Sequence, residues 1–185
     1  MREENDNQEN LKRLILQAKE GSSEAFEEVY RNYYTPLFRY ILTRIKDRAE
    51  AEDMTQVVFM KIWKHIPSWN TLHTSPISFF FTVARNTLID HFRKNSKKEI
   101  VSDEIVYNFS LSKDSGEDLS KDREMKEEMR NYILKLSPDQ QEIIILYYMN
   151  DMTYKEISEM IGKQEDAIRQ LHSRAIKKLR EMYKK

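Results

Sequence analysis

The stretch EISEMIGKQEDAIRQLHSRAIKKLR, residues 156–180, contains one of only three glycines in a chain of 185 residues. This glycine, Gly162, separates two segments whose residues favour helices. A glycine at the end of a helix tolerates the positive φ that a sharp turn requires. The stretch therefore predicts a helix-turn-helix, and its second helix should present a polar face to a ligand.

The second helix of this pair has two different faces when its residues are placed at about 100° each. One face is apolar: Ile168, Leu171, Ala175, Leu179 and Met182. The other carries basic and hydrogen-bonding residues: Arg169, Gln170, Ser173, Arg174, Lys177 and Arg180. Such a face suits the DNA major groove, where guanidinium and amide groups contact base edges and cations contact phosphates. We assign base or groove contacts to Arg169, Gln170 and Ser173, and phosphate contacts to Arg174 and Lys177. A solvated amphipathic helix with a basic end would show the same pattern.

Charge is unevenly distributed although the formal net charge is zero. Residues 163–185 carry eight bases and three acids, residues 76–98 carry five bases and one acid, and residues 99–128 carry four bases and ten acids. Two basic segments on either side of an acidic one suit a protein that contacts a polyanion twice. The chain has no cysteine, which excludes a disulfide framework and a thiolate metal site. We expect no metal and no cofactor.

Nearly all of the sequence has helical patterning, so we predict an all-α protein of two small helical domains joined by a flexible linker. The predicted boundaries are 1–94 for the N-terminal domain, 95–121 for the linker and 122–185 for the helix-turn-helix domain. Pro36 is expected to interrupt a helix, whereas Pro76 and Pro138 each follow a serine and should begin one. The linker contains an apolar cluster, Ile105, Val106, Tyr107, Phe109 and Leu111. This cluster could dock on a partner, form a short strand or clasp its own domain.

Two helices of the N-terminal domain have features of binding surfaces. The segment 54–63 is apolar over most of its circumference, so it is either enclosed in a core or in contact with a partner protein. In the segment 79–94, Thr82, Arg85, Asn86 and Arg93 share one face, and the preceding loop contains Trp69, His73 and Thr74. Such a surface could bind nucleic acid and stack an unpaired base. An exposed helix face beside a loop aromatic that packs into the core is the simpler interpretation.

Four segments together resemble the extracytoplasmic-function class of bacterial sigma factors. They are EAFEEVYRNYYTPLFRYI (24–41), AEDMTQVVFMKIW (51–63), FFFTVARNTLIDHFRK (79–94) and the stretch from LSPDQQ to KKLR (136–180), in the family's order and spacing. The resemblance covers roughly residues 11–180. It implies a dissociable subunit of RNA polymerase that directs transcription from particular promoters.

The resemblance also implies roles for the predicted surfaces. The helix-turn-helix would read the −35 element through Arg169, Gln170, Ser173, Arg174 and Lys177, and its domain would hold the β flap. The −10 element would be read by Thr82, Arg85, Asn86, Arg93 and Trp69, through a base that is flipped out of the duplex. The β′ clamp helices of core polymerase would contact Asp53, Gln56, Val57 and Met60. An anti-sigma factor is a further expected partner.

The sequence departs from the family pattern at several of these positions. Val57 stands where the family usually has Glu, so one polar contact to the clamp is either missing or replaced by packing. Phe79 and Phe80 replace a Trp-Leu pair. Asp166 and Ala167 replace a pair such as Gly-Thr near the DNA backbone. His172 lies on the apolar face of the recognition helix, where it is either a satisfied, partly buried histidine or a pH-sensitive weak point.

Other classes of function fit the sequence less well. An enzyme would need a motif such as HExxH, a Gly-rich phosphate loop or GxSxG, and none is present. A stand-alone helix-turn-helix regulator would explain only the C-terminal domain, and a helical adaptor would not explain the basic face. The polar N-terminus and the lack of a long apolar run predict a cytoplasmic protein without membrane insertion.

Overall fold

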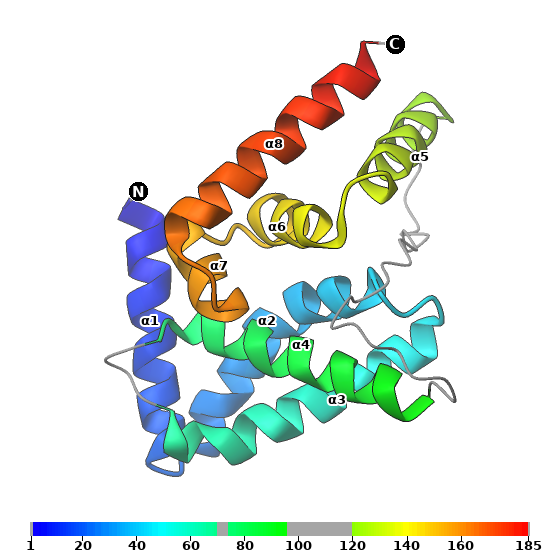
Figure 1. The fold of residues 1–185 in the computed structure, drawn as a ribbon. Coiled ribbons are helices and arrows are strands. Elements are labelled where there is room, and N and C mark those ends of the chain that lie inside the picture. Colours follow the sequence, from blue (N-terminus) through cyan, green and yellow to red (C-terminus); the bar gives the residue numbers. More distant parts are fainter. Residues whose placement is uncertain (1, 70–73, 96–119, 185) are drawn as a thin grey trace.

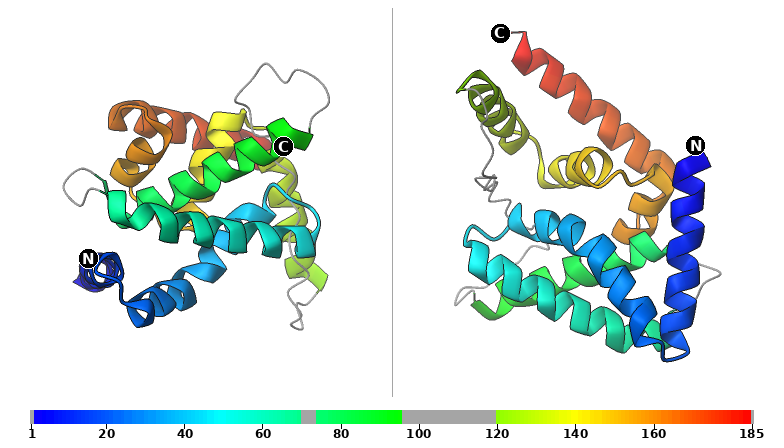
Figure 2. Two further views of the ribbon diagram at one scale, coloured as in Figure 1. Left: turned by 90° about the horizontal axis from the view of Figure 1, so that it is seen from below. Right: turned by 180° about the vertical axis from the view of Figure 1, so that it is seen from behind.

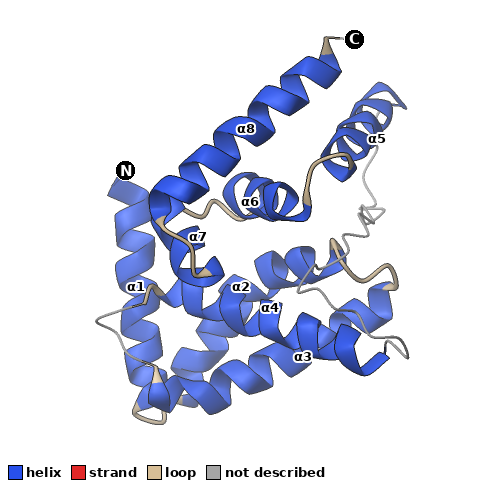
Figure 3. Cartoon of the chain, in the orientation of Figure 1, coloured by secondary structure: helices blue, strands red, loops and turns tan. Residues whose placement is uncertain are grey.

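The computed structural model describes residues 2–69, 74–95 and 120–184. Over these residues the fold is all-α, with eight α-helices, one short 3-10 helix and no strand (Figures 1 and 3). The predicted fold class is therefore confirmed. The apolar cluster from Ile105 to Leu111 and the loop residue His73 lie outside the described residues, so their predicted roles stay predictions.

The N-terminal module consists of α1 (Arg2–Lys19), α2 (Ser23–Leu42), α3 (Arg48–His65), η1 (Ile66–Ser68) and α4 (Pro76–Asn95). Short polar residues begin two of these helices. The Ser22 hydroxyl accepts the Ala25 N–H at 3.2 Å, and the Asp47 carboxylate accepts the Glu50 N–H at 2.8 Å. These caps satisfy backbone donors that have no partner within the first turn of a helix.

Pro36 does not interrupt a helix, and that prediction was wrong. It lies inside α2, which is continuous from Ser23 to Leu42. Proline removes one backbone hydrogen bond and costs roughly 3 kcal/mol within a helix. The residues around it compensate through burial, since Val29, Leu37 and Ile41 are fully buried in the core. Tertiary packing therefore outweighs local propensity at this position.

The C-terminal module consists of α5 (Ser120–Leu134), α6 (Pro138–Met149), α7 (Tyr154–Ile161) and α8 (Glu165–Tyr183). Helix α6 begins with Pro138 as predicted, and a capping box precedes it, in which the Ser137 N–H donates to Gln140 Oε1 at 3.1 Å. Helix α8 packs on α6 and α7 at one end and beside α5 at the other (Figure 2). Ala175 is fully buried in this packing.

The two modules lie directly against each other. Helix α7 packs on α4, and α6 packs on the C-terminal half of α2 (Figures 1 and 2). Buried side chains of both modules, such as Phe80, Leu88, Ile145 and Ile157, belong to one continuous hydrophobic cluster. The sequence did not indicate whether the modules are docked or separate, and in this structure they are docked.

Candidate DNA and polymerase interfaces

The predicted helix-turn-helix is present, and its geometry depends on one capping box and one glycine. At the start of α7, Glu156 accepts the Thr153 N–H at 2.9 Å, and the Thr153 hydroxyl accepts the Glu156 N–H at 3.3 Å. At its end, Gly162 is left-handed, with φ 76° and ψ 27°, and its N–H bonds the Ser158 carbonyl at 2.9 Å. The conformation predicted for Gly162 is confirmed. It allows α8 to begin shortly after α7 ends.

The two predicted faces of α8 are confirmed by burial. Ile168 and Ala175 are fully buried, and the other residues of the apolar face are half-buried. The polar face is exposed to solvent along its whole length: Arg169, Gln170, Ser173, Arg174, Lys177 and Arg180. All five residues assigned to DNA contact thus lie together on one accessible surface. Their contact with DNA stays a prediction.

Arg169 is held by two neighbours on this surface. Its guanidinium pairs with the Glu165 carboxylate one turn earlier on α8, and its central carbon lies 4.7 Å from the centre of the Tyr154 ring. A guanidinium between a carboxylate and an aromatic face keeps a restricted orientation. The spacing of Glu165 and Arg169 signals this pair in the sequence, whereas the contribution of Tyr154 depends on the tertiary fold.

His172 packs in a group of aromatic rings beneath this surface. Its ring centre lies 4.8 Å from that of Tyr147 and 5.4 Å from that of Tyr154, and its Nδ1 lies 3.1 Å from the Tyr154 hydroxyl oxygen. Burial lowers the pKa of His172 below its usual value. One ring nitrogen of His172 thus has a partner, whereas its Nε2 is buried without one among the described residues. Both interpretations of His172 therefore stay predictions.

Helix α4 brings together four of the five residues assigned to the −10 element. Asn86 and Arg93 are exposed, and Thr82 and Arg85 are half-buried beside them. The opposite face is core, where Phe80, Ala84, Thr87 and Leu88 are buried.

Trp69 does not share that surface. It is 5% exposed and its ring stacks on Phe79, with 6.3 Å between ring centres. A base cannot stack on the indole in this conformation, so the expectation that Trp69 offers a stacking face is corrected. The simpler interpretation, an aromatic side chain of the loop that packs into the core, describes it.

Helix α3 combines both interpretations that its sequence allowed. Six of its residues form the buried side: Ala51, Met54, Thr55, Val58, Phe59 and Ile62. Asp53, Gln56 and Met60 lie on the solvent side, with Met60 64% exposed, and Val57 is half-buried at its edge. An exposed methionine within an acidic and amide surface is suited to contact with a protein partner.

No sequence pattern predicted the most buried charged contact among the described residues. Arg44 Nη2 lies 2.6 Å from Glu142 Oε2, and the two side chains are 0% and 7% exposed. The Tyr40 hydroxyl donates to the other Glu142 oxygen at 2.7 Å. The sequence contains one signal for such a contact, a charged residue within each of the apolar segments YILTRI and EIIIL. Ionised side chains are rarely buried unless they are paired.

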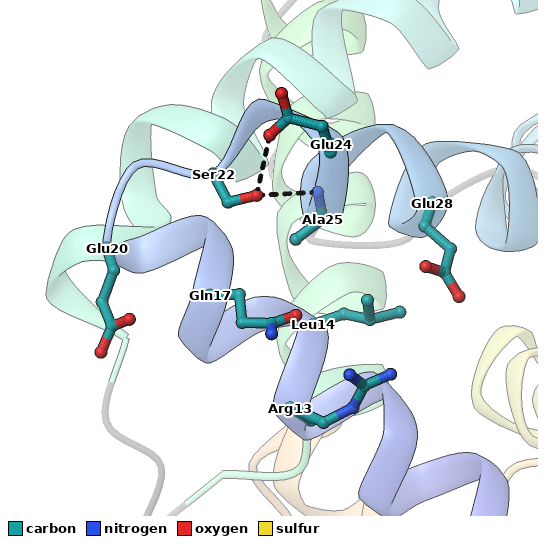
Figure 4. Close-up of a pocket in the computed structure, with 8 residues that line it drawn as sticks. All are labelled: Arg13, Leu14, Gln17, Glu20, Ser22, Glu24, Ala25 and Glu28. Carbon is teal, nitrogen blue, oxygen red and sulfur yellow. Dashed lines mark hydrogen bonds between the residues drawn. The ribbon is translucent and has the colours of Figure 1, made fainter.

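A polar pocket of about 480 Å³ lies between α1 and α2 (Figure 4). Arg13 and three carboxylates, Glu20, Glu24 and Glu28, surround it. The Ser22 hydroxyl donates to Glu24 at 3.0 Å while it caps α2, as the dashed lines show. The carboxylates of α2 fit the first turns of a helix, where negative charge is stabilised. This pocket includes none of the predicted binding residues.

Metal-binding clusters and membrane-spanning helices are both absent from the described residues. Within the ranges 2–69, 74–95 and 120–184, no group of three or more His, Cys, Asp or Glu side chains is arranged to hold a metal ion. None of the helices described over the same residues is long and apolar enough to cross a membrane.

Two family models match the chain, one in each module. Sigma-70 region 2 matches residues 29–98, and sigma-70 region 4 matches residues 132–181. The first match contains the predicted −10 and polymerase surfaces, and the second contains the helix-turn-helix.

Relatives and solved structures agree with these matches. The ECF RNA polymerase sigma factor SigM of Bacillus subtilis is 31% identical over 157 residues, which cover 85% of this chain and 94% of SigM. The RNA polymerase sigma factor SigZ of the same organism is 31% identical over 137 residues, covering 74% of each chain. The fold resembles that of CnrH, solved in complex with the cytosolic domain of CnrY, with a TM-score of 0.67, 17% identity and coverage of 92% of this chain and 95% of that one.

The sigma factor RpoE of Bartonella quintana, solved in complex with the anti-sigma factor NepR, has a TM-score of 0.66 and 22% identity, over 86% of this chain and 96% of that one. At such identities these two structures support the fold. SigM, with its higher identity and nearly complete coverage, supports the family. The chain belongs to the ECF RNA polymerase sigma factors, the dissociable subunits that direct core polymerase to promoters.

Proposed function

We propose that this sigma factor reads a −35 element as duplex DNA through the exposed face of α8. The observation that carries this proposal is the face itself, which is basic and hydrogen-bonding on the side opposite Ile168 and Ala175. Arg169, Gln170 and Ser173 lie nearest the start of the helix, where a recognition helix meets base edges. Arg174 and Lys177 lie farther along and supply phosphate contacts, which position the helix without selecting a sequence.

The N-terminal module supplies the −10 and polymerase contacts in this proposal. Arg85, Asn86 and Arg93 on α4 bind the nontemplate strand, and Thr82 borders them. The solvent side of α3, formed by Asp53, Gln56 and Met60, docks on the β′ clamp helices, with Val57 at its edge. Trp69 supports the core beneath α4 and makes no stacking contact with a base.

Further partners and the cellular location complete the proposal. The C-terminal module holds the β flap, and an anti-sigma factor binds the chain, as NepR binds RpoE of Bartonella quintana. The sigma factor acts in the cytoplasm, where polymerase and promoter DNA are found. It has no enzymatic activity of its own, and polymerase carries out the chemistry. A stand-alone regulator is not favoured, because the chain also matches sigma-70 region 2.

Transcription with purified core polymerase tests the assignment of α8. Arg169→Ala should reduce transcription that depends on the −35 sequence by about tenfold or more, because a good base contact contributes about 1 to 3 kcal/mol of discrimination. Arg180→Ala is the matched control, since Arg180 is an exposed arginine of the same helix outside the predicted contact set. Core affinity should stay unchanged in both variants. An equal loss of core affinity with Arg169→Ala would show that the residue acts in another way.

A further inference from the structure

Arg169 is held more firmly than the other cations assigned to the −35 element. Its guanidinium pairs with the Glu165 carboxylate, and its central carbon lies 4.7 Å from the centre of the Tyr154 ring. Arg174 and Lys177 have neither an ion pair nor a contact with an aromatic ring among the described residues. Phosphate contacts, which we assign to those two residues, need a charge but no fixed orientation. A base contact needs a fixed orientation as well, because the donors must meet two atoms of one base edge.

The ring of Tyr154, on α7, is itself held by residues of two other helices. It stacks on the Tyr147 ring of α6, with 4.9 Å between ring centres and 20° between ring planes. Its hydroxyl oxygen lies 3.1 Å from Nδ1 of His172, on α8. Contacts from three helices therefore determine where the ring lies and where the guanidinium that rests on it points.

The guanidinium of Arg169 is still accessible to a ligand. The side chain is 54% exposed, and its bond to Glu165 uses Nη2. A guanidinium has five N–H donors, so this bond leaves enough of them for the two that a guanine accepts. Tyr154, Glu165 and Arg169 also line one surface pocket of about 420 Å³. The pocket lies at the start of α8, the part of a recognition helix that meets base edges.

We propose that Glu165 and Tyr154 are positioning residues that hold Arg169 in the orientation in which it selects a guanine of the −35 element. This inference rests on the proposed −35 role of α8. Arginine binds the O6 and N7 atoms of guanine through two N–H donors, and the other bases do not offer this pair of acceptors in the major groove. Glu165 and Tyr154 act through Arg169 and contact no base themselves.

The two positioning residues contribute to binding and not to folding. An unrestrained arginine side chain loses rotamer freedom when a base contact fixes it, which lowers affinity by roughly two- to tenfold. Glu165 and Tyr154 impose that order before DNA binds, so the contact costs less. An exposed ion pair within one helix contributes little to stability, so its removal should leave the fold intact. Stability and base selection can therefore be measured separately.

Transcription by the full-length chain with core polymerase tests the proposal. The template is a promoter that the wild-type holoenzyme selects from a library of upstream sequences, and each base pair of its −35 motif is changed in turn. Arg169→Ala should remove the preference for guanine at one position. Glu165→Gln and Tyr154→Leu should lower the preference at that same position by about two- to tenfold and leave the other positions unaltered. Transcription from templates that lack this guanine should not fall in Glu165→Gln, since the change also removes a negative charge that repels phosphates.

Two control variants separate positioning from other roles. Tyr154→Phe keeps the ring beneath Arg169 and should keep the preference for guanine, which Tyr154→Leu weakens. Asp166→Asn removes a carboxylate from the same turn of α8, but Asp166 makes no ion pair among the described residues, so the preference should also stay. A guanine preference that Glu165→Gln and Tyr154→Leu leave unchanged would overturn the proposal. A loss of equal size at every base pair of the motif would overturn it too, because it would show a role in folding or in phosphate contact.

Magnetic resonance of the free chain separates this inference from the proposed function. Nitrogen relaxation at the arginine Nε atoms should show that Arg169 is more ordered than Arg174, and that Glu165→Gln or Tyr154→Leu removes the difference. Equal mobility of the two arginines in the wild-type chain would overturn the proposal. If Arg169 were ordered but the wild-type holoenzyme showed no preference at any −35 base pair, the proposed function would fail while the contacts that hold Arg169 would stand. If Arg169→Ala lost the preference for guanine while Glu165→Gln and Tyr154→Leu kept it, the proposed function would stand and the positioning role would fail.

Discussion

Replacement of Gly162 tests the turn on which the helix-turn-helix depends. An L-residue in the left-handed conformation costs about 1 to 2 kcal/mol. Apart from the glycine itself and its two neighbours in the chain, no atom of the described residues lies within 4 Å of a Cβ added at Gly162, so no clash adds to this cost. Gly162→Ala should therefore destabilise the fold by about 1 to 2 kcal/mol, and Gly162→Asn by less, since Asn tolerates this conformation. Gly162→Val should cost the most, because a β-branched residue is strongly disfavoured there.

Thermal unfolding followed by circular dichroism measures these differences. For a chain of this size, about 1 kcal/mol shifts the midpoint by roughly 2 to 4 °C. Gln164→Ala is a control in the same turn, because this exposed side chain makes no cap hydrogen bond, and its effect should stay within about 0.5 kcal/mol. Equal effects of Ala, Asn and Val would refute the argument from backbone conformation. A loss well above about 2 kcal/mol for Ala would show that the position is packed.

Three further substitutions address the cap, the histidine and the polymerase surface. Thr153→Ala removes the acceptor of the Glu156 N–H and should cost about 1 kcal/mol in chemical unfolding. Burial lowers the pKa of His172, so the unfolded chain binds the proton more readily and stability should fall as pH drops below about 6.5. His172→Gln should reduce that pH dependence, and an unaltered pH profile in His172→Gln would contradict this. Met60→Glu should weaken core polymerase binding without changing the melting temperature, since Met60 is exposed, and a lower melting temperature would show a structural role instead.

Much of the fold could be predicted because it depends on local chemistry. The capping residues Thr153 and Ser137, the glycine at 162 and the two faces of α8 follow from side-chain type and helical spacing alone. Pro36 shows the limit of such reasoning, because its helix is maintained by the burial of residues that pack against other helices. Helix propensity depends on the residues of one segment, whereas burial in the core depends on how several segments pack together.

The parts of the site that could not be predicted depend on contacts between distant residues. Trp69 was placed correctly in a loop, but its burial depends on a contact with Phe79 of α4, which helical spacing does not determine. Glu142 lies 98 residues from Arg44, and no periodicity within either segment connects them. Helical spacing places residues on a face, but it does not determine what that face meets. The docking of the modules is therefore a result of the structure and not of the sequence patterns.

Runoff transcription with bacterial core polymerase tests the central claim most directly. Core polymerase alone and core polymerase with this protein would be compared on a library of upstream sequences. We expect discrete start sites that appear only with the protein and share two motifs about 16 to 17 base pairs apart, as the family resemblance implies. No stimulation on any template, together with tight duplex binding by the protein alone, would contradict the assignment and indicate a stand-alone regulator.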